Sequence, residues 1–204
     1  MSATRTPRRP RSDGERSRRT ILETAAQLAS IRGLDRLSIG DLADEAGMSK
    51  SGLYAHFGSK EELQMATIEM AKGIYDAEVI VQADRAEPGQ ARLLALADSF
   101  IDHLERRVFP GGCFFIAAAS AMAGQEGRVR DRLAAFQADW MSLLRQQAMI
   151  ARDAGQLAPD EDIDQLVFEL ESYMLNAHSV FAFNGDTGIL ERARRAVRRR
   201  LDVA

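Results

Sequence analysis

The residues best suited to chemistry lie close together, between Ser38 and Phe57. The polar and small members of this stretch, which offer amine, hydroxyl and imidazole groups or an open backbone, are Lys50, Ser51, Gly52, Tyr54 and His56. Leu53 and Phe57 are four residues apart, so on a helix they form one inward side and leave the polar group facing outward. Such groups hydrogen-bond to base edges and phosphates in the DNA major groove. The predicted chemistry is recognition of double-stranded DNA.

Local signals predict the two short helices that would position these side chains. Ser38 followed by Asp41 is a capping box, so a helix should start at Ile39. Gly47 should end that helix, because the exit turn needs the positive φ that glycine adopts at little cost. Ser49 should cap the second helix. Two short helices joined by a tight turn form a helix-turn-helix, whose second helix enters the major groove.

Three runs in and after this region resemble one known family. The runs are Gly47-Met48-Ser49-Lys50, Leu53-Tyr54-Ala55-His56-Phe57 and Ser59-Lys60-Glu61-Glu62-Leu63. Together they resemble the DNA-binding domain of the tetracycline-repressor (TetR) family, and the similarity extends from about Arg16 to about Tyr75. Its most specific part is Leu-Tyr-x-His-Phe followed by Ser-Lys-x-x-Leu. The alternative interpretation is a compact three-helix core with an exposed polar face.

The resemblance implies a set of DNA-binding residues on both short helices and on the start of the next. The set is Ser38, Ile39, Ser49, Lys50, Ser51, Gly52, Tyr54, His56 and Lys60. In the family, the positions of Tyr54, His56 and Lys60 contact phosphates, which suits their donor groups. Lys50, Ser51 and Gly52 would lie nearest the base edges, where Lys50 can donate to guanine. Gly52 has no side chain to read a base, so the operator sequence stays open.

Composition limits the class of protein. The chain has 204 residues, 46% of them hydrophobic, and five prolines, which suits one long or two small helical domains. The most apolar segment, Cys113 to Ala123, is shorter than the roughly 20 residues that cross a bilayer. No apolar segment follows the N-terminal arginines, so we expect no signal peptide. Cys113 is the only cysteine, which excludes an intrachain disulfide and a cysteine zinc cluster. We expect a buried Cys113, a cytoplasmic location and no membrane partner.

Charge is distributed unevenly along the chain. Residues 1–60 hold 11 Lys and Arg against 7 Asp and Glu, whereas residues 61–204 hold 16 against 23. A basic N-terminal part on an acidic body fits nucleic acid bound at one end. The first residues carry arginines and prolines without apolar periodicity, so we expect a disordered basic arm over residues 1–15, with a helix starting near Asp13. The arm either follows DNA phosphates or is a solvated terminus.

The predicted fold class is all-α, with about nine helices in two domains. A helix-turn-helix DNA-binding domain should occupy residues 16–76, and a regulatory domain for ligand binding and dimerisation should occupy residues 77–204. Helices are expected at 13–32, 39–46, 50–57, 60–83, 90–108, 113–123, 128–154, 160–184 and 188–201. The helix at 60–83 carries the apolar residues Leu63, Ala66, Met70 and Ile74.

The body also resembles the regulatory half of many TetR proteins. The resemblance rests on Gly-Gly-Cys-Phe-Phe before an alanine-rich helix and on Gly-Gln-Leu-Ala-Pro-Asp before a long one. It implies a homodimer in which the last two helices of each subunit pair, with Leu166, Leu170, Met174 and Phe181 as candidates for the interface core. Asp160 to Asp164 should cap a helix. The arginines from 192 to 200 are interpreted as a solvated helix face.

Aromatic residues with a few polar ones are spread over the body helices, and such a mixture lines ligand pockets between helices. The candidate ligand-binding residues are Phe100, His103, Leu104, Phe114, Phe115, Phe136, Trp140, Tyr173 and His178. The same residues would also suit an ordinary core. We expect an apolar effector with one or two polar groups, and the response should be blocked by Ala118→Trp or Ala121→Trp.

Three functions are compatible with these patterns. The first is a transcription regulator, a repressor that a small apolar effector releases from a pseudo-palindromic operator. The second is a DNA-binding protein whose body only dimerises or recruits another protein, which a body without a sizeable cavity would favour. The third is an enzyme carrying a helix-turn-helix, but the sequence has no H-E-x-x-H, G-x-S-x-G or phosphate loop. We therefore expect no enzymatic activity, no metal site and no cofactor.

Overall fold

The computed structural model describes residues 11–45 and 47–202, and within these ranges all regular structure is helical. The elements are α1 (Arg11–Arg32), α2 (Ile39–Glu45), α3 (Lys50–Phe57), α4 (Lys60–Tyr75), a π-helical turn η1 (Asp76–Ile80), α5 (Val81–Ala83), α6 (Gln90–Glu105), α7 (Phe114–Met122), α8 (Arg128–Asp153), α9 (Ile163–Asn184) and α10 (Thr187–Arg200). α4, η1 and α5 form one continuous helix, so the described part of the chain has nine helices. The all-α prediction is confirmed.

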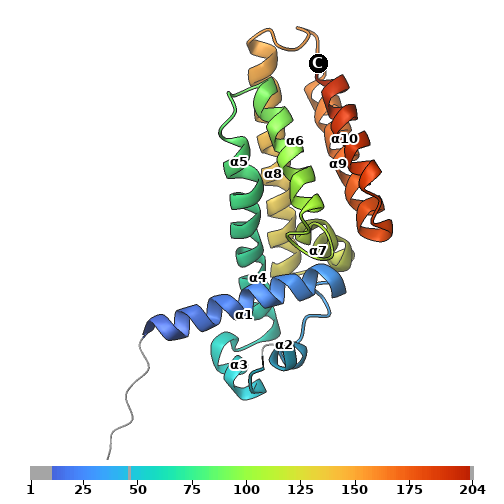
Figure 1. Cartoon of the computed structure of the whole chain (residues 1–204). Coiled ribbons are helices and arrows are strands. Elements are labelled where there is room, and N and C mark those ends of the chain that lie inside the picture. The colour runs from blue at the N-terminus through green and yellow to red at the C-terminus, as the bar shows by residue number, and fades with distance from the viewer. Residues whose placement is uncertain (1–10, 46, 203–204) are drawn as a thin grey trace, which may run out of the picture.

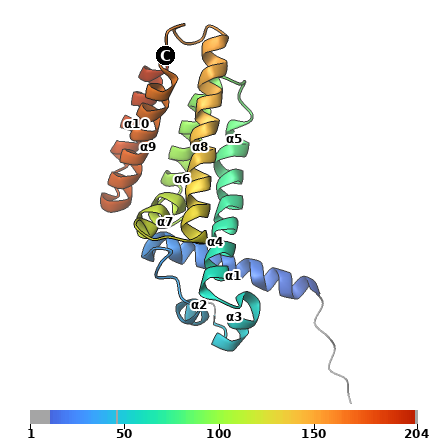
Figure 2. The ribbon, with the colours of Figure 1, turned by 180° about the vertical axis from the view of Figure 1, so that it is seen from behind.

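A small head and a taller bundle share this architecture. Figure 1 shows α1 lying across the lower end of the bundle, with α2 and α3 below it, on the side away from the bundle. These three helices form the head, and α4 rises from it into the body. Figure 2 shows α8 standing beside α4 and α5, and α9 paired with α10. Within the described ranges, no helix is both long enough and apolar enough to cross a membrane.

The helix-turn-helix signals act as predicted. The Asp41 N–H donates to the Ser38 hydroxyl oxygen (3.1 Å), and that hydroxyl donates to the Asp41 carboxylate (2.6 Å). Gly47 has a φ of +61°, the left-handed conformation the turn requires. The Gly52 N–H donates to Ser49 Oγ (3.1 Å) and so caps α3. These local bonds fix how α3 leaves the turn.

The head is attached to the body where α1 meets the loop before α7. The Gly111 N–H donates to Ser30 Oγ (3.2 Å), and Gln27 Nε2 donates to the Val108 carbonyl (3.1 Å). A Cβ on Gly111 would lie 1.9 Å from the Ser30 carbonyl oxygen, so only glycine permits this approach. The contact fixes the C-terminal end of α1 against the body.

The most deeply buried face of α4 is not the one that its apolar residues mark in the sequence. Of the four apolar residues named from the sequence only Leu63 is fully buried, whereas Ala66, Met70 and Ile74 are half-buried and pack against the core. The buried face instead holds Gln64, Thr67, Ile68, Ala71 and Tyr75. The polar members satisfy their hydrogen bonds internally: Gln64 Nε2 donates to the Leu34 carbonyl (2.8 Å), and the Thr67 hydroxyl donates to the Leu63 carbonyl (2.7 Å). Polar residue types therefore concealed the true core face.

Several predicted boundaries need correction. The arm expected over residues 1–15 is wrong for residues 11–15, because α1 already begins at Arg11, while residues 1–10 lie outside the described ranges. α6 ends at Glu105, three residues early, because Arg107 adopts a φ of +49° and turns the chain so that Phe109 enters the core.

The arginines of α10 are not simply a solvated face. Arg194 pairs with Asp102 (2.6 Å) and Glu105 (2.8 Å) of α6, and Arg200 pairs with Glu161 (2.5 Å). These bonds hold α10 against α6 and against the start of α9. Asp162 caps α9 by accepting from the Gln165 N–H (3.0 Å), which agrees with the capping interpretation of this acidic run.

The predicted core of a dimer interface is wrong. Leu166, Leu170, Met174 and Phe181 are at most 3% exposed, because they pack inside the chain's own core. The large apolar side chains that α9 leaves exposed are Phe168 (61%), Leu175 (44%) and Phe183 (88%). Periodicity identified an apolar face of α9, but not that the chain itself covers that face.

Two histidines are buried without hydrogen-bond partners among the described residues. His103 is 1% exposed and His178 is 7% exposed, and both ring nitrogens of each lack a partner. Burial lowers the pKa of His103 to about 4 and also lowers the pKa of His178. Both rings are therefore neutral near pH 7 and belong to the core.

The pKa of His103 predicts a dependence of stability on pH. Between pH 6.5 and about 4 the unfolded chain binds a proton at this site that the folded chain does not, so stability is complete above that window and is lost as pH falls. The loss reaches about 3 kcal/mol near pH 4. His103→Leu should reduce this slope in urea unfolding followed across pH. The control is Phe109→Leu, because the Phe109 ring centroid lies 5.5 Å from that of His103; this variant should lower stability equally at every pH. If His103→Leu leaves the slope of stability against pH unchanged, His103 is not its source.

Candidate DNA-binding surface and effector pocket

α3 presents most of the predicted DNA-binding residues at the surface. Tyr54 is 56% exposed, and Lys50, Ser51 and the N-cap Ser49 are exposed as well. The Ser49 and Ser51 hydroxyl oxygens lie 3.3 Å apart, and His56 packs beside Phe57 with ring centroids 6.1 Å apart. Gly52 is partly exposed, and a Cβ there would lie 3.1 Å from Ser49 Oγ. Glycine therefore leaves the helix cap undisturbed and the backbone accessible.

Two predicted contacts need qualification. Ile39 is 5% exposed, so its side chain belongs to the core and only the backbone at the start of α2 is available to DNA. Lys60 Nζ donates to the Asp35 carbonyl, which ties α4 to the loop before α2. A phosphate contact by Lys60 would therefore have to replace or share this bond.

Arg18 adds a cation that sequence patterns did not indicate. Its guanidinium lies over the Phe57 ring, 5.1 Å from the centroid, although Arg18 is on α1 and Phe57 ends α3. The side chain is exposed, so one face of the guanidinium remains free to bind an anion. Only the packing of α1 against α3 brings the two residues together.

The body contains a pocket of about 410 Å³ between α4, α6, α7, α8 and α9. Four of the predicted ligand residues line it, namely Phe100, Phe115, Phe136 and Trp140. The lining residues that the sequence did not indicate include Tyr75, Cys113, Leu133, Gln137, Glu171 and Met174. Its outer part is formed by Ala119, Ser120, Leu175 and Ser179, all of them exposed. The cavity is therefore open to solvent between α7 and α9.

Five predicted ligand residues are not in this pocket. Leu104 and Phe114 are fully buried in the core, His103 and His178 are the unpartnered core histidines, and Tyr173 packs partly buried against the core. The structure places four of the five in the core and Tyr173 against it. The prediction that Trp at position 118 or 121 would fill the pocket is also wrong, because Ala118 and Ala121 do not line the cavity.

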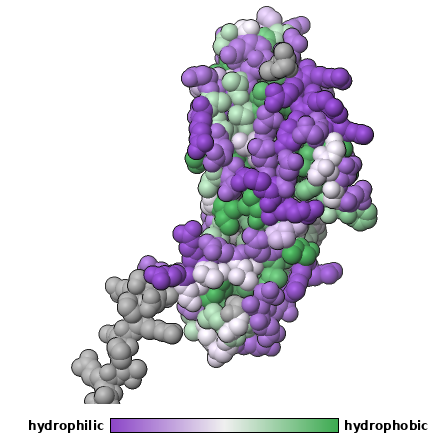
Figure 3. Space-filling model, in the orientation of Figure 1, coloured by the Kyte–Doolittle hydropathy of each residue, from purple (hydrophilic) through white to green (hydrophobic). Residues whose placement is uncertain are grey.

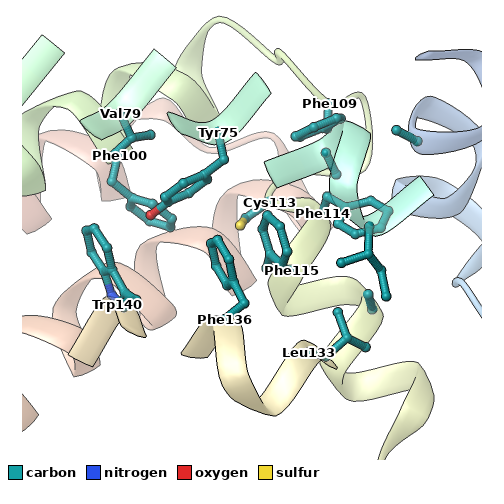
Figure 4. Packing of buried hydrophobic residues seen from close by; sticks show 14 of the residues in the cluster. Tyr75, Val79, Phe100, Phe109, Cys113, Phe114, Phe115, Leu133, Phe136 and Trp140 are labelled. Atoms are coloured by element: carbon teal, nitrogen blue, oxygen red, sulfur yellow. The ribbon is translucent and has the colours of Figure 1, made fainter. Parts of the chain in front are cut away.

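Tyr75 is the centre of the aromatic cluster beside the pocket. Figure 4 shows its ring among Phe100, Phe115, Phe136 and Trp140. It meets Phe115, Phe136 and Trp140 edge to face, with ring centroids 5.8, 5.2 and 5.8 Å away. Phe115 and Phe136 lie nearly parallel, at 7° to each other. Because Tyr75 is the last residue of α4, the helix that starts in the head reaches the pocket wall there, before it continues through η1 and α5.

Polar groups in the pocket are few and mostly neutral. Trp140 Nε1–H donates to Glu171 Oε2 (2.8 Å). Burial raises the pKa of the Glu171 carboxyl, raises that of Cys113 to about 11, and raises that of Tyr75 well above its usual range. Cys113 is buried, as predicted, and is a neutral thiol. Within the described residues, no three His, Cys, Asp or Glu side chains gather as a metal site would require.

Ion pairs join the pocket helix α8 to α4. Arg128 Nη1 lies 2.8 Å from both Glu61 and Glu62, and Arg132 binds Glu69 through two nitrogens, at 2.6 and 3.1 Å. The hydrogen bond from Arg132 lowers the pKa of Glu69. α8 also carries Leu133, Phe136, Gln137 and Trp140 of the pocket wall. A displacement of that wall would therefore act directly on the helix that supports the head.

Comparison with known families agrees with this arrangement. Residues 21–66 match "Bacterial regulatory proteins, tetR family", and residues 89–197, more than half of the chain, match "Tetracyclin repressor-like, C-terminal domain". The chain belongs to the TetR family. These ranges fall within the domains expected at 16–76 and 77–204.

Individual TetR proteins align over different lengths. The HTH-type transcriptional repressor BepR of Brucella suis is 25% identical over 179 residues, 83% of each chain. A TetR regulator from Chloroflexus aurantiacus superposes with a TM-score of 0.84 at 24% identity, covering 91% of this chain and 94% of that one. AibR, in complex with isovaleryl coenzyme A and operator DNA, superposes with a TM-score of 0.74 at 24% identity. The superposition covers 90% of this chain and 97% of the AibR chain. The first curated relatives are matched over 33% of their own length.

Blocking the pocket tests whether it binds small molecules. Ala119→Trp places a large side chain at an exposed position of the pocket wall, so the fold should be unaffected. Calorimetric titration with 2-naphthylmethanol, a neutral two-ring probe, should show at least tenfold weaker binding than in the unmodified protein. Ala123→Trp, exposed just beyond α7 and outside the lining, should bind the probe normally. Equal binding by both variants would mean that the probe occupies another site.

Proposed function

We propose that this chain is a DNA-binding transcription regulator, acting as a repressor that a small effector releases from its operator. The observation that carries the proposal is the single helix that spans both sites. α4 begins at the Ser59 cap beside the recognition helix and ends at Tyr75 in the pocket wall. A ligand that moves Tyr75 therefore moves the support of α3.

The pocket favours this function over a body that only dimerises. A volume of about 410 Å³ falls within the range of about 300–1,000 Å³ typical of ligand sites, and its wall is mainly apolar with a few polar groups. A core built only for assembly has no need of such a cavity. BepR is named a repressor, and AibR was captured with both isovaleryl coenzyme A and operator DNA, which supports assigning a small-molecule site and a DNA site here.

A homodimer would place two recognition helices on one operator. We assign its contact face to the exposed side of α9, which carries Phe168, Leu175 and Phe183, together with α10. On the face seen in Figure 3, hydrophilic residues predominate over the bundle and apolar residues form only separate patches. A two-fold dimer reads a pseudo-palindrome whose half-site spacing follows from its geometry. We also propose a cytoplasmic location, because a regulator of this kind acts on DNA.

The function is tested by DNA selection followed by titration. Selection of bound sequences from a random duplex pool should return pseudo-palindromes. Operator affinity of the full chain should then fall when a ligand that occupies the pocket is added. A pocket ligand that leaves operator affinity unchanged at saturation contradicts the repressor-release mechanism, because a ligand with equal affinity for both states shifts nothing.

Substitutions on α3 and α4 should separate phosphate contacts from base contacts. Lys60→Ala and Tyr54→Phe should weaken binding to all DNA sequences, and Lys60→Ala should reduce the slope of log affinity against log salt by about 1. Lys50→Ala should instead change preference at one base pair by roughly 1–3 kcal/mol. The control is Lys72→Ala, because Lys72 pairs with Asp76 far along α4. An unchanged salt slope in Lys60→Ala, with the fold intact by circular dichroism, would exclude Lys60 from the interface.

Charge placed on the exposed face of α9 should dissociate the dimer. Phe183→Arg, alone or with Phe168→Arg, introduces a cation where two apolar surfaces would meet, and neither side chain is buried in the chain's own core. Analytical ultracentrifugation should show a dimer of the unmodified protein at micromolar concentration and a folded monomer of the variant. Val81→Arg, at a 52% exposed apolar residue of α5, should remain dimeric. A dimer that survives both α9 substitutions would require a different interface.

A further inference from the structure

The pocket contains one carboxylate and no basic side chain. Glu171 is the only Asp or Glu in its lining, and none of the residues that line it is Lys, Arg or His. Tyr75 and Cys113 are neutral, since burial raises the pKa of both above the physiological range. Any charge in the pocket is therefore negative.

Glu171 differs from Asp164 and Glu169, the other acidic residues within α9. Asp164 pairs with Arg145 (2.7 Å), Glu161 pairs with Arg200 (2.5 Å), and Glu169 also binds Arg200. Glu171 has no cationic partner among the described residues and accepts one hydrogen bond, from the indole of Trp140. A carboxylate in apolar surroundings without a counter-charge is unfavourable, and burial does raise its pKa. A ligand that supplied a cation would remove that penalty.

The surrounding rings suit the same kind of ligand. Trp140 binds Glu171 through its indole edge, and Tyr75, Phe136 and Phe100 line the pocket around it. Aromatic faces attract a cation, most strongly where water is excluded, and they also bury flat apolar groups. Carboxylate and ring faces together select a molecule that is apolar and positively charged.

We propose that the effector of this protein is a lipophilic cation, an aromatic molecule that carries one amine or amidinium group, and that Glu171 is the residue that selects it. The inference rests on the proposed function in that the pocket is taken as the effector site. The cationic nitrogen binds the free oxygen of Glu171, while the rings lie against Phe136 and Trp140. A carboxylate or acyl phosphate ligand finds no basic partner in this lining and is repelled by Glu171.

A matched series of probes tests the charge preference. The probes are 2-naphthylmethylamine, 2-naphthylmethanol and 2-naphthoate, which share a ring system and are cationic, neutral and anionic at neutral pH. Binding to the full chain is followed by calorimetry and by the fluorescence of Trp140, the only tryptophan. The amine should bind at least tenfold more tightly than the alcohol, and the naphthoate more weakly than the alcohol. Equal affinities, or tightest binding by the naphthoate, would overturn the proposal.

Glu171→Gln isolates the role of the charge. Its amide oxygen can still accept from Trp140, so packing is retained while the negative charge is removed. The variant should lose at least tenfold in amine affinity and change its alcohol affinity less than threefold. Asp164→Asn removes a charge from an exposed position of the same helix and should change neither. If Glu171→Gln binds the amine as tightly as the unmodified protein, Glu171 is only an anchor for Trp140 and the proposal is wrong.

Operator binding in the presence of each probe is measured separately. Amine binding that depends on Glu171 but leaves operator affinity unchanged would support the ligand class and contradict the repressor-release function. Release of DNA by the naphthoate, without any effect of Glu171→Gln, would support the function and contradict the ligand class. The two ideas can therefore fail independently.

Discussion

The packing of Tyr75 against the rings of α7 and α8 is the contact on which the rest of this structure depends. Tyr75 is 3% exposed and stands edge to face against three aromatic rings. Each such pair contributes about 0.5–1.5 kcal/mol beyond the burial of apolar area. The residue is also the last of α4, which begins beside the recognition helix. Since interiors are closely packed, the ring cannot move alone, and its displacement has to be taken up by the helix.

The backbone after Tyr75 is arranged to permit such a change. η1 replaces the α-helical hydrogen-bonding pattern over Asp76–Ile80, and the Val81 N–H bonds to the Asp76 carbonyl five residues earlier. π-helical turns of this kind are frequent at functional sites. The ion pairs of Arg128 and Arg132 with α4 lie on the surface, where single pairs contribute little and are screened by salt. In contrast, the contacts of Tyr75 with Phe136 and Trp140 of α8 are buried.

The features that could be predicted from sequence are those fixed by near neighbours in the chain. The caps at Ser38, Ser49 and Ser59 depend on bonds to a residue three positions away, so their residue types were sufficient. The pocket depends on how five helices approach one another. Phe115 and Phe114 are adjacent and equally apolar, yet only Phe115 lines the cavity. Nothing near Glu171 in the sequence shows that Trp140 lies opposite it, so the sequence did not mark Glu171 as a pocket residue.

α9 connects the pocket with the proposed subunit interface. Met174 and Glu171 face the cavity from the inside, while Leu175 and Ser179 line its outer part and are exposed on the helix that carries Phe168 and Phe183. A partner subunit on this face would lie beside the pocket opening, so ligand occupancy and the spacing of two recognition helices would share one element. The coupling free energy that such a link must supply follows from the change in operator affinity. An effector that lowers operator affinity tenfold must itself bind tenfold more weakly to the DNA-bound form, a coupling of about 1.4 kcal/mol. That is comparable to one edge-to-face aromatic contact, so rearranging the Tyr75 cluster is sufficient to supply it.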